Sequence, residues 1–215
     1  MNLIHAFLSL FRKPISAAPS PVAHPPAKPS TLSDRFSALW REASIKPDRL
    51  VEVARVGSRI VANRARYESI QVGVPWYLIG VIHEREASGR FDRHLANGDP
   101  LTSRTVNAPA GRPVIGSPPF TWEDAARDAL IHNGIARRLN GTLEAMLDAL
   151  ERYNGLGYRN RNVLSPYIWG ATTRQQPGKY IKDGIFDPTV MDTQIGCAAI
   201  LMWLADRGHI ELPKA

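Results

Sequence analysis

The most chemically informative part of the sequence is a predicted helix over residues 74–89 that ends in a carboxylate. Leu78, Ile82 and Glu86 are spaced by four residues, so Glu86 extends an apolar helical stripe to the end of the helix. Burial on such a face raises the pKa of a carboxyl group, and the negative potential of the helix C-terminus acts in the same direction. Glu86 is therefore a candidate general acid, although a glutamate at a helix edge can also simply reach water or pair with an arginine.

A second carboxylate follows in a segment rich in turn residues. Asp99 lies in the turn sequence of residues 97–100, and Thr105 follows six positions later. If Asp99 and Thr105 face Glu86, the carboxylate and the hydroxyl can position or activate a water molecule. Alternatively, Asp99 only shapes its turn, a role that suits aspartate. Asp92 is a weaker candidate for the second carboxylate.

The elements that position these residues are predicted to be mostly helices. Residues 90–119 are predicted to form a small β-hairpin lobe, because two turn signals flank the strand-like residues 101–106. Residues 155–189 are predicted to be rich in loops, and Glu84 is expected to face solvent from the helix that carries Glu86. The other predicted helices run from a cap at Ser33 or Asp34 through Ala43, from Pro47 through Val61, from a cap at Thr121 over residues 122–133, from about Arg138 to Tyr153 and from about Thr189 to Ala205.

The order of these features resembles the lysozyme superfamily. Arg85-Glu86-Ala87-Ser88 is similar to the signature around the catalytic glutamate of goose-type lysozymes and soluble lytic transglycosylases, with Ala87 in place of the usual serine. Residues 152–157 resemble the Tyr-Asn-Ala-Gly motif of the same families, although Gly155 directly follows Asn154. Residues 74–204 as a whole resemble phage endolysin-like proteins of Gram-negative hosts.

This resemblance implies an α+β, predominantly helical, lysozyme-like fold with a small β-hairpin lobe over residues 34–215. It implies cleavage of the glycan strands of peptidoglycan, as in a muramidase of the endolysin type, with Glu86 as general acid. Asp99 and Thr105 are six positions apart and resemble the aspartate–threonine pair of phage-type lysozymes, although the gap from Glu86 to Asp99 is longer than in that family. The resemblance implies that they are catalytic helpers, which favours hydrolysis by an inverting enzyme with carboxyl groups roughly 6.5–9.5 Å apart. A lytic transglycosylase that uses Glu86 alone remains an alternative, as does a non-catalytic cell-wall-binding protein on the same fold.

The resemblance also implies residues that line the sugar cleft. Tyr153 and Asn154 are expected there, although asparagine followed by glycine is also an ordinary helix stop. Trp169 lies in a predicted loop, where an aromatic face suits stacking on a sugar and packing in the core equally well. No metal or other cofactor is expected, because His83-Glu84 lacks the second histidine of the zinc-protease motif. The lone Cys197 lies in an apolar stretch and is expected to be a small buried side chain.

Charge and composition point to an anionic partner. The 215 residues carry a net charge of +7, and residues 1–33 form a basic, apolar and proline-rich tail, expected to be disordered, with three basic residues and no acidic one. The tail could contact an anionic membrane, and the bacterial cell envelope or periplasm is the expected site of action. A nucleic-acid partner is not expected, because no clustered basic helix or aromatic sheet motif is present. The protein is expected to be a monomer.

Overall fold

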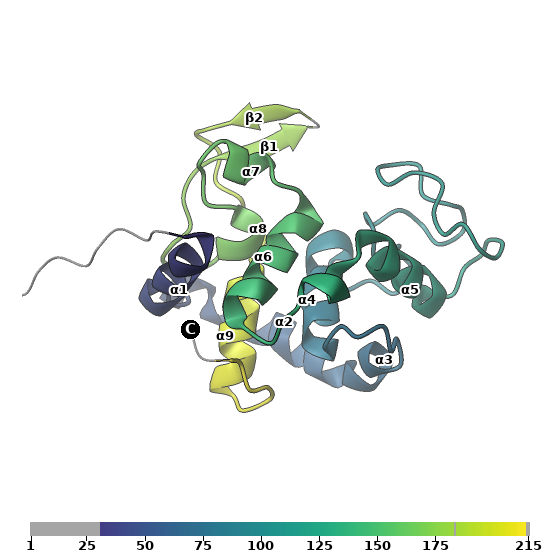
Figure 1. Cartoon of the computed structure of the whole chain (residues 1–215), viewed down its shortest axis with the longest axis horizontal. Helices are drawn as coiled ribbons and strands as arrows, with labels where there is room; N and C mark the ends of the chain where they lie inside the picture. The colour runs from purple at the N-terminus through teal and green to yellow at the C-terminus, as the bar shows by residue number, and fades with distance from the viewer. Residues whose placement is uncertain (1–30, 183, 214–215) are drawn as a thin grey trace, which may run out of the picture.

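The computed structural model describes residues 31–182 and 184–213, which form a predominantly helical α+β arrangement (Figure 1). Residues 1–30 of the predicted tail lie outside the described residues. No helix within the described ranges is long and apolar enough to cross a membrane. The elements are α1 (Leu32–Glu42), the 3-10 turn η1 (Pro47–Arg49), α2 (Leu50–Ala62), α3 (Arg64–Glu68), α4 (Trp76–Ala87), α5 (Trp122–Asn133), η2 (Ile135–Arg138), α6 (Leu143–Asn154), α7 (Gly157–Asn160), α8 (Pro166–Trp169), β1 (Lys179–Lys182), β2 (Ile185–Asp187) and α9 (Cys197–Asp206).

Hydrogen-bonding caps decide where several helices begin. The Thr121 hydroxyl accepts from the Asp124 amide and starts α5 at the predicted residue. The helix predicted up to Ala43 is present as α1, but its predicted cap was wrong, because Thr31 caps it in a reciprocal capping box with Asp34. The prediction that α6 begins near Arg138 was also wrong, because Thr142 caps the helix after the η2 turn has ended.

The last helix also begins later than predicted. It starts at Cys197, directly after Gly196, and not near Thr189. Residues 189–196 instead form an irregular segment, in which Asp192 contacts Arg85 and Lys179. The carboxylate of Asp192 therefore serves a tertiary contact, and this segment does not continue the helix.

The predicted β-hairpin lobe over residues 90–119 is wrong. This segment has no strand, and its only ladder contact is an isolated bridge between Arg93 and Pro100. Five prolines fall in it after residue 99, and each removes a backbone donor from any ladder. The antiparallel pair of the described chain is β1 with β2, inside the segment that was predicted to be loops.

The helix that carries Glu86 is the centre of the core. Side chains around the whole circumference of α4 are buried, and α4 packs against α2, α3 and α9. His83 is buried with them: its Nδ1 lies 3.1 Å from the Tyr67 hydroxyl and its Nε2 2.9 Å from the carbonyl oxygen of Arg90. Burial lowers the pKa of His83 to about 4, so this imidazole is a neutral core group.

The close contact between α2 and α9 depends on a glycine. A Cβ atom at Gly57 would overlap the indole ring of Trp203, which is itself buried. We expect Gly57→Ala to lower the free energy of unfolding by about 2 kcal/mol, because the clash outweighs the higher helix propensity of alanine.

Urea denaturation checks this expectation. Ser58→Ala is the matched control, because Ser58 is the exposed neighbour on the same helix and should change stability by no more than about 0.5 kcal/mol. Equal stability of Gly57→Ala and Ser58→Ala would contradict the packing described here.

Candidate active site

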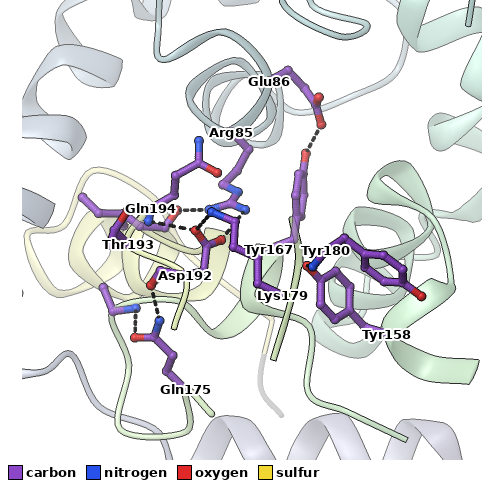
Figure 2. Close-up of polar contacts among 12 residues, drawn as sticks. Arg85, Glu86, Tyr158, Tyr167, Gln175, Lys179, Tyr180, Asp192, Thr193 and Gln194 are labelled. Atoms are coloured by element: carbon purple, nitrogen blue, oxygen red, sulfur yellow. Dashed lines mark hydrogen bonds and ion pairs between the residues drawn. The ribbon is translucent and has the colours of Figure 1, made fainter. Parts of the chain in front are cut away.

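Glu86 lies in the last turn of α4, with its carboxylate facing α8 (Figure 2). The Tyr167 hydroxyl donates a 3.0 Å hydrogen bond to Glu86 Oε1. Tyr153, near the end of α6, interacts electrostatically with Glu86. Its hydroxyl donates a hydrogen bond to the carbonyl oxygen of Leu95 at 3.1 Å. Burial and the Glu86 charge raise the pKa values of Tyr153 and Tyr167 well above the usual tyrosine value, so both phenols remain protonated.

The environment of Glu86 favours its neutral form. Burial raises its pKa from 4.5 to about 7, against the opposing effects of the Tyr167 hydrogen bond and the Arg85 charge. Part of the residue nevertheless stays accessible to solvent. A carboxyl group that is protonated near neutral pH can transfer its proton to a bound molecule that reaches it.

Arg85, the neighbour of Glu86, is held in a buried ion pair. Its Nη2 lies 3.2 Å from Asp192 Oδ2, and the two side chains are only 6% and 2% exposed. Its Nη1 donates to the carbonyl oxygen of Ile195 at 3.2 Å, and its guanidinium lies 4.8 Å from the centre of the Tyr167 ring. Arg85 thus fixes both the segment before α9 and the ring of the tyrosine that binds Glu86 (Figure 2).

A polar cavity of about 600 Å³ lies beside this ion pair. Asn154 contributes from the end of α6, Tyr158 from α7, and Lys179 and Tyr180 from β1. Lys179 Nζ lies 2.9 Å from Asp192 Oδ1. The β1–β2 hairpin, next to α7 in Figure 1, therefore forms one wall of a cavity that reaches the residue next to Glu86.

Asp99 lies in a turn near the C-terminal end of α4, but its carboxylate forms its hydrogen bonds with residues 106 and 107. A Cβ atom at Gly98 would stand 2.5 Å from the carbonyl oxygen of Glu86, so the turn packs against the backbone of α4. The Asp99 carboxylate accepts from the amides of Val106 and Asn107 at 2.8 and 3.0 Å and from the Asn107 side chain at 2.6 Å. Burial opposes ionisation, but these hydrogen bonds prevail and lower the pKa of Asp99.

Thr105 is bonded within the same loop. Its hydroxyl donates to the carbonyl oxygen of Pro109 at 2.5 Å and accepts from the Arg112 amide at 2.9 Å. None of the hydrogen bonds of Asp99 or Thr105 involves Glu86. Asp92, the weaker candidate, is exposed and pairs with Arg90.

Among the other predicted site residues, Asn154 is exposed and lines the cavity, whereas Tyr153 is partly buried beside Glu86. The sugar-stacking interpretation of Trp169 is wrong, because its side chain is 1% exposed and belongs to the core in α8. Glu84 does not face solvent as predicted, because its carboxylate pairs with Arg59 and is 15% exposed. Cys197 is a free, fully buried thiol, as predicted.

Sequence reasoning missed Tyr167 and Asp192. Tyr167 stands in the apolar segment of residues 165–170, where a phenol must find a partner when it is buried, and this was the available signal. Asp192 carried no comparable signal, because its partner Arg85 is 107 positions away. Within residues 31–182 and 184–213, no group of three His, Cys, Asp or Glu side chains is arranged to hold a metal ion.

Comparison of the chain with protein-family models, with curated proteins and with solved structures finds no match in any of the three. Function must therefore be argued from the geometry and electrostatics of the site.

The raised pKa of Glu86 predicts a pH-dependent cost in stability. Between pH 4.5 and 7 the folded protein retains a proton that the unfolded chain releases, so the free energy of unfolding falls as the pH rises through this window. The free energy of unfolding falls by about 3 kcal/mol across this window, because the pKa of Glu86 is roughly two to three units higher in the folded protein. At each pH, the stability of Glu86→Gln is compared with that of the wild type. We expect this difference to favour the variant by about 3 kcal/mol more at pH 8 than at pH 4.

Thermal or urea unfolding of both proteins at pH 4 and pH 8 measures this difference. Glu68→Gln serves as the control, because Glu68 is an exposed glutamate in a surface ion pair with Arg64. A Glu86→Gln stability change that is the same at both pH values would mean that Glu86 titrates like an ordinary glutamate.

Proposed function

We propose that the protein cleaves the glycan strands of peptidoglycan and that Glu86 is the general acid. The observation that carries this proposal is the raised pKa, about 7, of the partly exposed residue Glu86 at the end of a buried helix. The resemblance of residues 85–88 and 152–157 to lysozyme-superfamily motifs supports the substrate class, and it makes the lysozyme-like fold part of the same proposal. The net charge of +7 favours attraction to the anionic bacterial envelope.

The hydrogen bond from Tyr167 assigns different roles to the two oxygens of Glu86. Because Oε1 accepts from the Tyr167 hydroxyl, the transferable proton resides on Oε2. Glu86 Oε2 donates this proton to the glycosidic oxygen as the bond to the sugar carbon breaks. The carboxylate that is left behind is stabilised by the Tyr167 hydrogen bond and by the charge of Arg85, both of which favour the ionised form.

Two routes can complete the reaction after the glycosidic bond breaks. In hydrolysis, a water positioned by Asp99 and Thr105 attacks the sugar carbon and gives a proton to the Asp99 carboxylate. In the lytic transglycosylase route, a hydroxyl of the same sugar attacks, and Glu86 takes up its proton. The three hydrogen bonds that Asp99 accepts within its own loop favour the second route, because they occupy both carboxylate oxygens.

Mass spectrometry of the fragments released from purified peptidoglycan tests the function. We expect glycan fragments from the wild type and from Glu68→Gln, and at least a hundredfold less from Glu86→Gln, because the general acid is removed. Anhydro ends identify the transglycosylase route, and reducing ends identify hydrolysis. If the folded wild type binds peptidoglycan and releases no fragments, the non-catalytic wall-binding alternative replaces the enzyme.

The pH profile tests the role of Tyr167 separately. Its hydrogen bond lowers the pKa of Glu86, so Tyr167→Phe should raise this pKa further. The alkaline limb of kcat/KM reports loss of the proton from the free enzyme's acid and should move to higher pH. Measurement of kcat/KM between pH 5 and 9 for both proteins checks the direction. An alkaline limb that is unchanged or moves to lower pH would show that Tyr167 does not lower the pKa of Glu86.

A further inference from the structure

The cavity beside Arg85 has an excess of positive charge. The described residues that line it include three cations, Arg85, Lys179 and Lys182, and one carboxylate, Asp192. Arg85 and Lys179 both contact Asp192, at 3.2 and 2.9 Å, so this carboxylate is shared by two cations. One cation in this trio is therefore not neutralised, and the exposed Lys182 at the rim adds another. Such a surface favours an anionic ligand.

Arg85, which lines this cavity, also carries a buried hydrogen-bond donor without a partner among the described residues. The Nε of Arg85 has no hydrogen-bond partner in the described part of the chain, although the side chain is only 6% exposed. A buried N–H group without a partner costs free energy. Lys179 is about one-third exposed and can turn a donor toward a ligand while it still contacts Asp192.

The cavity is connected to Glu86 through Tyr167. The guanidinium of Arg85 lies over the Tyr167 ring, and the hydroxyl of that ring holds the Glu86 carboxyl group. A ligand in the cavity can therefore contact Arg85, which packs on the tyrosine that binds Glu86; Figure 2 shows these three side chains. Asn154, which follows the Tyr153 beside Glu86, lines the same cavity.

We propose that this cavity binds a carboxylate of the peptide stem that peptidoglycan carries on its muramic acid residues, with Lys179 and Arg85 as its partners. This inference rests on the proposed function and makes the substrate the peptide-bearing strand. The carboxylate accepts from Lys179 Nζ at the open side of the cavity. The glycan backbone then runs past Glu86, and the stem anchors it in one register. The β1–β2 hairpin, which contributes Lys179, acts as the wall that selects the substituted strand.

Neutralising the stems tests the charge directly. The stem carboxylates of purified peptidoglycan are converted to amides with carbodiimide and ammonium, and initial rates at limiting substrate are compared with native material. We expect the wild type to cut native peptidoglycan about tenfold faster than the amidated form, the effect of one charge-assisted hydrogen bond. Lys179→Gln should bring this ratio close to one, and Lys179→Arg should restore most of it.

A distant cation provides the matched control. Arg207 is exposed just past the end of α9, and Arg207→Gln removes one positive charge without touching the cavity, so the wild-type ratio should be retained. Because each ratio is taken within one protein, partial unfolding of a variant affects both substrates equally. Equal rates of the wild type on both substrates, or a wild-type ratio in Lys179→Gln, would overturn the inference. No release from native material would overturn the proposed function itself and the inference with it.

Discussion

The structure depends on a carboxyl group that a buried helix places at its C-terminal end. The side chains of α4 are enclosed around its whole circumference, so its last turn places Glu86 where water is scarce. An ionised carboxylate is costly in such surroundings, and the group keeps its proton near neutral pH. Tyr167 and Arg85 act in the opposite direction, and they limit the rise in pKa so that the proton can still leave. The pKa of Glu86 is thus set by burial, which raises it, and by the contacts with Tyr167 and Arg85, which lower it.

The buried ion pair between Arg85 and Asp192 connects this balance to the rest of the chain. Isolated charges at 6% and 2% exposure would be strongly destabilising, and breaking such a pair typically costs about 3–5 kcal/mol. Lys179 and the amide of Gln194 complete the shell around Asp192, and together with Arg85 they lower the pKa of this carboxylate despite its burial. The pair therefore fixes the segment before α9, the β1 strand and the Tyr167 ring relative to the acid.

The sequence predicted the parts of this site that local patterns control. The four-residue spacing of Leu78, Ile82 and Glu86 placed the carboxylate correctly at the end of its helix, and Thr121 correctly marked the start of α5. The hairpin was predicted in the wrong segment, because the turn signals of residues 90–119 were strong while the five prolines of the same segment removed ladder donors.

The partners of Glu86 and Arg85 could not be predicted, because these contacts span 81 and 107 positions and no periodicity encodes them. Asp99 shows the reverse problem. Its residue type suited both catalysis and a turn, and only the tertiary structure showed that both of its oxygens accept hydrogen bonds from residues 106 and 107.

The central claim is that Glu86 carries a proton near neutral pH in the folded protein. Carbon-13 NMR of the glutamate side-chain carboxyl groups, titrated from pH 3 to 9 and assigned with Glu86→Gln, measures this property directly. We expect one resonance with a midpoint near pH 7 that is absent from the spectrum of the variant. A midpoint near 4.5 for the Glu86 resonance would contradict the account, because the side chain would then be an ordinary surface carboxylate and not a general acid.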